Sequence, residues 1–331
     1  MLHIVLPGLL GPLSAADSGS LATIDAPYLL NILRRSVCER SLASATYALV
    51  LPGMTQRFPI AALSYLADFG SLPDRPCFRC DPVHLQAGLA DAVLFDAREF
   101  EISEHDAQQL AAAFNNHFNG DGVKLIFAEP TRWYLLMNES RDLDTPAVRE
   151  ISGKNLGVYL PQGQHTAFWN RLLNETQMLF YQHSLNAQRE EQGRPAINGV
   201  WVYGGNPITD FDFEYRHIVT DDALCTGIAL YKGVDHRPLL PSDISISENT
   251  LIYSECLDAL SRQDSGQWVS KLNELDEILF NPVWHALSRR QIRHVVIDTG
   301  EAGRFRFSAN RILNTWRAIR YHKRSIQSYI A

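Results

Sequence analysis

Strand-like and helix-like segments alternate at both ends of this chain of 331 residues. The strand candidates are apolar runs at residues 2–6, 46–51, 249–255 and 292–300. The helix candidates have apolar residues at helical spacing and lie at 26–36, 59–69 and 265–290. We expect Asp25 to cap the first of these helices. This alternation is typical of a parallel sheet covered by helices, so the two ends predict a doubly wound α/β fold.

The middle of the chain has a different pattern. Residues 83–96 alternate like antiparallel strands, and 124–129 and 132–138 form a strand pair around a turn at Pro130. We expect one helix over 103–118, with Ser103 as its N-cap, and a second, long amphipathic helix over 165–193. We therefore predict a discontinuous α/β core of residues 1–75 and 195–331, interrupted by an α+β insertion at 76–194.

Composition and charge exclude several classes of protein. The net charge of −7 argues against a general nucleic-acid binder, which would carry a basic field. No run approaches the roughly 20 apolar residues that span a bilayer. The N-terminal apolar run has no Lys or Arg before it, so we interpret it as a buried strand rather than a signal peptide. These features predict a cytoplasmic protein.

The five cysteines are Cys38, Cys77, Cys80, Cys225 and Cys256. Their odd number and scattered positions favour free thiols in a reducing compartment over a disulfide framework. The C-x-x-C spacing of Cys77 and Cys80 leaves three alternatives. A zinc site needs two further ligands that have no matching motif here, and a redox motif needs a helix N-terminus where the sequence reads as extended. We favour two ordinary buried or half-buried thiols.

The segments "ISGKNLGVYLPQG" (151–163) and "NETQMLFYQHSLNAQREEQGRPAINGVWVYGGN" (174–206) carry a family resemblance. The chain resembles the archaeal-type cofactor-independent phosphoglycerate mutases, and through "RWY" and "NETQMLFYQHSLN" it is similar still more closely to the bacterial regulatory protein RpfE family. The matching residues are Gly153, Lys154, Tyr159 to Pro161, Gly163, His183, Asn186, Arg189, Gly193, Pro195, Asn198 and Gly204. The resemblance implies an alkaline-phosphatase-like sheet with residues 198–203 as a core strand, whose glycine turn faces the active-site cleft.

The same resemblance implies two divalent metals and a serine nucleophile, and these positions have changed. Pro7 stands where the first strand ends in a metal-binding Asp, and Phe58 and Pro59 stand at the nucleophilic Ser and the Asp after it. Asp258 and Asp298 match two carboxylate ligands, as vestigial positions, but Arg262 and Thr299 stand where histidines are expected. Two carboxylates without imidazoles match a two-metal site poorly, so we expect no catalytic residues, no metal and no cofactor.

Three arginines match arginines of the family, namely Arg79, Arg132 and Arg189. Guanidinium groups bind phosphate or carboxylate in a bidentate manner, so these residues, with His183 and Asn186, are candidate ligand-binding residues. The alternative is that each arginine is neutralised by a neighbour such as Asp81, Glu129 or Glu190, and that His183 and Asn186 contact a neighbouring loop.

These observations predict a non-catalytic regulatory or ligand-binding protein on a phosphoglycerate-mutase-like scaffold. Its expected partners are a phosphorylated or carboxylated metabolite and an unidentified protein, with neither nucleic acid nor membrane. The alternative is a divergent phosphomutase or phosphatase with a site rebuilt from Thr55, Asp258 and Asp298. The C-terminal stretch 304–325 is basic, and we interpret it as a docking helix rather than a binding patch.

Overall fold

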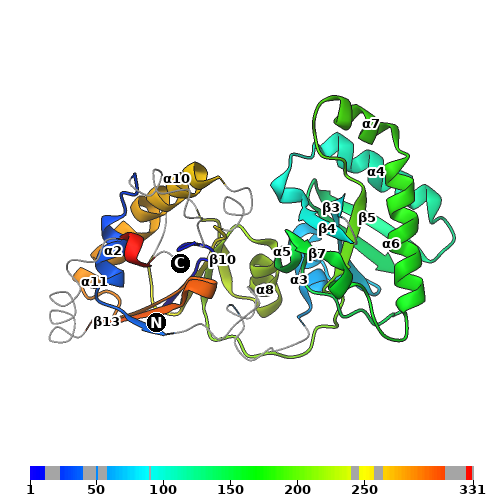
Figure 1. Ribbon diagram of the computed structural model, residues 1–331. Coiled ribbons are helices and arrows are strands. Elements are labelled where there is room, and N and C mark those ends of the chain that lie inside the picture. The colour runs from blue at the N-terminus through cyan, green and yellow to red at the C-terminus, as the bar shows by residue number, and fades with distance from the viewer. Residues whose placement is uncertain are drawn as a thin grey trace. The chain divides into compact units, whose positions relative to one another are not determined.

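The computed structural model describes residues 1–11, 23–39, 50, 58–88, 91–239, 246–256, 264–309 and 326–329. The chain folds into two compact units. Unit 1 comprises Met1–Thr55 and Phe211–Ala331, and unit 2 comprises Gln56–Asp210. Each unit contains its own sheet (Figure 1). The domain boundaries expected at residues 75 and 195 stay a prediction.

Unit 1 is built on a seven-stranded sheet of order β10-β9-β11-β1-β12-β13-β2. The strands, in that order, are Asp235–Arg237, His217–Thr220, Thr250–Tyr253, Leu2–Val5, His294–Asp298, Arg304–Ser308 and Val37–Glu39. The first five are parallel, and β13 and β2 are antiparallel. Because β1 lies between β11 and β12, strands from both ends of the chain share one sheet, as the sequence predicts for an α/β core.

Helices cover this sheet. They are α2 (Pro27–Leu33), α8 (Ala223–Lys232), α10 (Ser265–Leu275) and α11 (Asn281–Ser288), with a π-helical stretch at Asp276–Phe280 between the last two. Short 3₁₀ turns lie at Gly300–Ala302 and Ile326–Tyr329. Alternate residues of β1, Leu2 and Ile4, pack with apolar side chains of α2, α10 and α11 in one buried cluster. The mixed α/β class predicted from the sequence is confirmed.

Unit 2 is built on a six-stranded antiparallel sheet. Its strands are β5 (Val123–Glu129), β6 (Arg132–Met137), β3 (Cys77–Ala87), β4 (Ala92–Asp96) and β7 (Lys154–Asn155), with β8 (Gly199–Tyr203) paired to β3. Its helices are α3 (Ile60–Phe69), α4 (Glu104–His117), α5 (Val148–Ile151), α6 (Thr166–Tyr181) and α7 (Ser184–Glu191), with 3₁₀ turns at Ala97–Glu99 and Leu156–Tyr159. The antiparallel pairs expected in the middle of the chain are therefore present.

The two faces of this sheet differ in what they pack against. Side chains of one face, such as Phe78 and Trp133, share a buried cluster with α4 and α6. On the opposite face, Tyr134 and Leu136 pack with Ala61 of α3. Successive side chains of a strand point to opposite faces, so each residue of β3, β6 and β8 can be assigned to the α4–α6 face or to the α3 face.

Two sequence predictions are wrong. The strand at 199–203 pairs with β3 in unit 2, not with the parallel sheet, because its partner strand lies in the same unit. The long helix expected over 165–193 is two helices, α6 and α7. The helix breaks where His183 takes an extended conformation and its side chain accepts a hydrogen bond from the Leu185 amide. None of the described helices is both long and apolar enough to cross a membrane.

Candidate functional site

The carboxyl end of β1 is a buried turn. Every residue from Leu6 to Gly11 is buried, and Leu9 and Leu10 belong to the core cluster of unit 1. The Pro7 carbonyl accepts a hydrogen bond from the Cys256 amide at 3.0 Å, and the Gly8 carbonyl accepts one from the Trp268 indole at 2.9 Å. This turn therefore consists of core packing and internal hydrogen bonds, and its Pro7 side chain has no ligating atom.

Asp298, at the carboxyl end of the neighbouring strand β12, is fully buried. Its Oδ2 atom accepts a hydrogen bond from Nε of Arg304 at 2.6 Å and forms an ion pair with Nη2 of the same residue, also at 2.6 Å. Its other oxygen lies 3.4 Å from the Gly300 amide, at the start of the following turn. The carboxylate thus has a cationic partner from the adjacent strand and caps a turn.

The two-metal centre implied by the family resemblance can be tested against these atoms. Pro7 offers no ligand, and the Asp298 carboxylate is engaged by a guanidinium, which would repel a cation. Among the described residues, no group of three or more His, Cys, Asp or Glu side chains is placed to hold a metal ion. The donors in the described part of the chain therefore do not fit a metal pair. Asp258, Arg262, Thr55 and the basic stretch 310–325 lie outside the described residues.

The glycine turn after β8 contacts helix α3 of the same unit. The Gly204 carbonyl accepts a hydrogen bond from the Ala61 amide at 3.0 Å, in the first turn of α3. Gly204 has a φ of +67°, and a Cβ atom there would lie 2.8 Å from Cβ of Ile60. The Asn206 side chain bonds the Phe58 carbonyl at 3.3 Å, so the residue at the expected serine position is joined to this turn. The glycine turn is therefore in contact with the first turn of α3.

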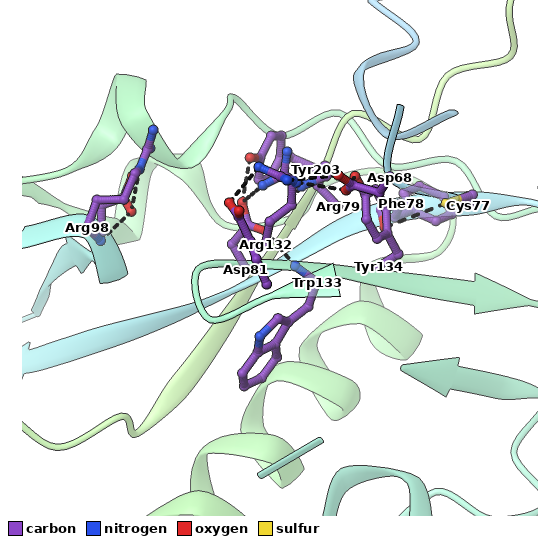
Figure 2. A network of polar contacts seen from close by, with 12 residues as sticks. Asp68, Cys77, Phe78, Arg79, Asp81, Arg98, Arg132, Trp133, Tyr134 and Tyr203 are labelled. Atoms are coloured by element: carbon purple, nitrogen blue, oxygen red, sulfur yellow. Dashed lines mark hydrogen bonds and ion pairs between the residues drawn. The ribbon is translucent and has the colours of Figure 1, made fainter. Parts of the chain in front are cut away.

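Asp81 is the centre of a buried polar network on the α3 face of unit 2 (Figure 2). Its carboxylate accepts hydrogen bonds from Arg79 Nε at 3.1 Å and Arg79 Nη2 at 2.6 Å. The Tyr203 hydroxyl donates to it at 2.6 Å, and the Trp133 amide at 3.2 Å. Burial alone would lower the pKa of Arg79. The charge of the Asp81 carboxylate outweighs this effect and helps to raise the pKa well above its usual value, so this arginine stays charged.

Arg79 also lies between two tyrosine rings. Its register partners are Tyr134 on β6 and Tyr203 on β8, on either side of β3. The guanidinium carbon is 5.6 Å from the centroid of each ring, within range of cation–π attraction. A Tyr–Arg–Tyr row thus crosses three strands, while the Trp133 side chain points to the other side of the sheet (Figure 2).

Asp68 of α3 is the second acceptor of this network. Arg132 donates to it from Nε at 2.7 Å and Nη2 at 2.8 Å, and the Tyr134 hydroxyl donates at 2.5 Å. Nη1 of Arg132 bonds Glu129, whose side chain is 44% exposed, at 2.5 Å. Burial raises the pKa of the Tyr134 hydroxyl, which keeps it a donor. Arg132 therefore binds two carboxylates. One is Asp68 of α3, whose side chain is largely buried, and the other is the solvent-exposed Glu129.

The third arginine lies elsewhere. Arg189, on α7, bonds Asp106 of α4 at 3.0 Å and the carbonyls of Glu101 and Pro195 at 2.8 and 2.9 Å. Because α4 covers the face opposite α3, Arg189 is on the other side of the sheet from Arg79 and Arg132. The three arginines therefore do not face one another. The partner of Arg189 is Asp106, rather than Glu190 as the alternative proposed.

His183 and Asn186 both bond to backbone. His183 caps α7, as described above. The Asn186 amide nitrogen donates to the carbonyls of Phe180 and Ile197, at 2.7 and 2.9 Å, and its oxygen accepts from the Ile197 amide at 2.8 Å. These bonds join the α6–α7 corner to the segment that leads into β8.

The C-x-x-C pair lies in extended strand β3. Cys77 and Cys80 are buried free thiols, as the sequence predicts, and their spacing puts them on opposite faces. Burial raises the pKa of Cys77 to about 12 and that of Cys80 well above its usual range.

Sequence reasoning missed Asp68, Tyr134 and Tyr203, which complete the network. Two of its contacts have a local signal: Arg79 and Asp81 are two residues apart, so a strand puts both on one face, and Arg132 and Glu129 flank the turn at Pro130. The contact of Asp68 with Arg132 spans 64 residues and follows from the fold alone.

The fold is an α/β fold of the alkaline-phosphatase type. The structure of the PH0037 protein from Pyrococcus horikoshii superposes on it with a TM-score of 0.50 at 13% identity, covering 92% of this chain and 85% of that one. Residues 57–186 match the family model described as 2,3-bisphosphoglycerate-independent phosphoglycerate mutase. The scaffold is thus similar to that of these mutases.

Two curated relatives have the same description. The mutase of Methanosarcina barkeri (strain Fusaro / DSM 804) is 24% identical over 187 residues, which cover 54% of this chain and 46% of the relative. That of Methanosarcina mazei (strain ATCC BAA-159 / DSM 3647 / Goe1 / Go1 / JCM 11833 / OCM 88) is 21% identical over 170 residues, covering 49% and 42%. The matched part spans less than half the length of each relative.

Proposed function

We propose that this chain is a non-catalytic regulatory protein, which binds a phosphorylated or carboxylated metabolite on a phosphoglycerate-mutase-like scaffold. The observation that supports it best is the contact between Asp298 and Arg304. A guanidinium at 2.6 Å from this carboxylate takes the place a divalent cation would need. The buried Pro7 turn supports the same proposal, because it offers no ligand at the end of β1. We also propose that the chain is more similar to the RpfE family than to the mutases, and that it is located in the cytoplasm.

The proposed ligand contact is Arg132. The side chains of Arg79 and Arg189 are 10% and 2% exposed and are bonded by buried partners. The Arg132 side chain is 19% exposed, and its bond to Glu129 involves a carboxylate that is 44% exposed. Because Glu129 is the more exposed member of this pair, an anionic ligand can reach Nη1 from solvent and replace it. Asp68 would hold the guanidinium in place meanwhile.

Two experiments test the proposal. The purified protein is analysed for bound metal and assayed for mutase and phosphatase turnover of 3-phosphoglycerate with added manganese. We expect neither stoichiometric metal nor turnover. Stoichiometric metal, with turnover that a chelator abolishes, would instead support the divergent phosphomutase with a rebuilt site.

The ligand contact is tested by thermal shift with phosphoglycerates, phosphosugars and dicarboxylates. Glu129→Gln removes the competing carboxylate, so we expect a larger ligand-induced shift than in the wild type. Arg132→Ala should abolish the shift, and Arg171→Ala, at an arginine whose side chain is 51% exposed, is the control. Equal shifts in all four proteins, or none with any anion, would remove Arg132 as a ligand contact. The remaining partner of the proposal is an unidentified protein; the net charge of −7 supports neither nucleic acid nor an anionic membrane.

A further inference from the structure

The outer edge of β5 is the feature that carries a further inference. Among the described strands, β5 is the first strand of its sheet and pairs with β6 on one side only. The free edge of such a strand presents amide and carbonyl groups that can pair with a strand of another molecule. The strand has seven residues, VKLIFAE, of which Val123, Ile126 and Phe127 favour β-structure, with one charge of each sign. A strand of this kind needs protection against pairing with its own copies.

Asn115 of α4 provides contacts at this edge. Its Oδ1 atom accepts a hydrogen bond from the Leu125 amide at 2.7 Å, and its Nδ2 donates to the Leu125 carbonyl at 2.9 Å. Backbone groups of an edge strand alternate between its two sides. Since both groups of Leu125 point outward, the outward groups on either side of it are those of Val123 and Phe127. Asn115 thus occupies the middle of the three outward positions.

One carboxamide offers a donor and an acceptor to a single residue, as a neighbouring strand would. The same arrangement occurs within the sheet, where Asn198 bonds the Leu85 amide at 2.7 Å and the Leu85 carbonyl at 2.9 Å. That contact lies just beyond Val83 and Gly199, the last register pair of β3 and β8. In both places an asparagine side chain takes the position of a missing strand residue.

We infer that Asn115 blocks the outer edge of β5 and thereby prevents two copies of this chain from pairing β5 to β5. The occupant it excludes is a second copy, because antiparallel pairing about Leu125 is self-complementary. In that arrangement Val123 of one copy faces Phe127 of the other, and all three outward positions are paired. With Asn115 in place, the central pair cannot form.

The test compares Asn115→Ala with Asn116→Ala, a loss of the same side chain from the exposed neighbouring position on the same helix. Light scattering over a wide concentration range measures the mass of each protein. We expect Asn115→Ala to approach twice the mass of the wild type as concentration rises, and Asn116→Ala to match the wild type. Hydrogen exchange at the Leu125 amide should quicken in dilute Asn115→Ala, because its acceptor is gone.

A rescue variant links the association to this edge. Val123→Pro removes an outward N–H, which an edge strand tolerates, so Asn115→Ala with Val123→Pro should return to the wild-type mass. If Asn115→Ala does not fold, Asn115→Asp keeps the acceptor for the Leu125 amide and frees only the carbonyl. It should then show weaker association of the same kind. The inference is overturned if the Leu125 amide exchanges faster in a variant whose mass equals that of the wild type at every concentration, or if Val123→Pro leaves the association unchanged.

Discussion

Asp298 and Arg304 are register partners on the antiparallel strands β12 and β13, and the buried carboxylate of one is neutralised by the guanidinium of the other. Each residue is thereby the charged partner of the other. The buried carboxylate has a cationic side chain as its partner, and the arginine is held at one end of its strand. The consequences of this contact can be measured as stability.

Arg304→Ala should destabilise unit 1 by about 3 kcal/mol, because it leaves a buried carboxylate without its countercharge. Arg306→Ala is the matched control on the same strand. Its side chain is 53% exposed and pairs with Glu39, so we expect a loss of less than about 1 kcal/mol. Hydrogen exchange in urea measures the stability of each unit through its own peptides. Separate measurement is needed because a protein of two units need not unfold in a single two-state transition. Equal losses for the two variants would show that the Asp298 contact has no special weight.

His3 should make unit 1 sensitive to acid. Burial, with Arg304 and Arg306 nearby, lowers the pKa of this histidine from 6.5 to about 3, and its Nδ1 lies 2.6 Å from the Tyr215 hydroxyl. Below pH 6.5 the unfolded chain binds a proton that the folded chain does not. Stability should therefore fall by about 1.4 kcal/mol per pH unit as the pH drops from 6.5 towards 3. His3→Gln removes this contribution, and urea titrations at several pH values that show the same slope for both proteins would contradict it.

Asp81→Asn should destabilise unit 2 strongly. The substitution leaves Arg79 buried without a countercharge, and removal of one partner of a buried pair costs about 3–5 kcal/mol. Asp74→Asn is the control, since that side chain is 73% exposed and pairs with an exposed arginine. Urea denaturation followed through unit 2 peptides measures both. A loss below that of one ordinary hydrogen bond would mean that the network around Asp81 is not coupled.

Gly204→Ala should loosen the start of α3. A side chain at a left-handed φ costs about 1–2 kcal/mol, and overpacking against Ile60 adds about 1–3 kcal/mol. Gly193→Ala separates the two effects, because Gly193 has a φ of +70° but no atom within 4 Å of the added Cβ. Thermal unfolding should show the larger loss for Gly204→Ala. Similar losses would mean that only the backbone conformation matters.

Alkylation should distinguish the thiols. Cys38 is exposed, whereas Cys77, Cys80, Cys225 and Cys256 are buried. Burial raises the pKa of Cys77 to about 12 and that of Cys225 well above its usual range, so neither forms the reactive thiolate near neutral pH. Iodoacetamide labelling of the native protein should modify Cys38 first. Rapid labelling of Cys77 would contradict its burial in β3.

The sequence predicts elements well where the signal is local. Ser103 caps α4 as expected, with its Oγ accepting from the Asp106 amide at 3.0 Å. Asp25 does not cap α2. The buried carboxylate of Asp276 accepts from the Tyr28 and Leu29 amides instead, and it comes from nearly 250 residues away. A capping motif cannot reveal a partner supplied by another helix.

The candidate site shows the same division. The changes at Pro7 and Phe58 can be read from the sequence, because they need only an aligned position. The bonds of Arg132 to Asp68 and of Arg189 to Asp106 cannot, since these carboxylates come from α3 and α4, and only the folded sheet decides which face each helix covers. The assignment of β8 to the wrong sheet has the same cause. The apolar sequence of a strand indicates that the strand is buried, but it does not indicate which strand is its partner.

The place of β1 in its sheet has a consequence for how the protein is made. Leu2 pairs with Thr250 and Val295, so during synthesis β1 waits for nearly 250 further residues before it gains either neighbour. At about 5–20 residues per second, that wait lasts on the order of tens of seconds, while the stretch Gln56–Asp210 has already been synthesised and can fold. During that interval the apolar residues of β1 remain without the two strands that bury them in the folded sheet.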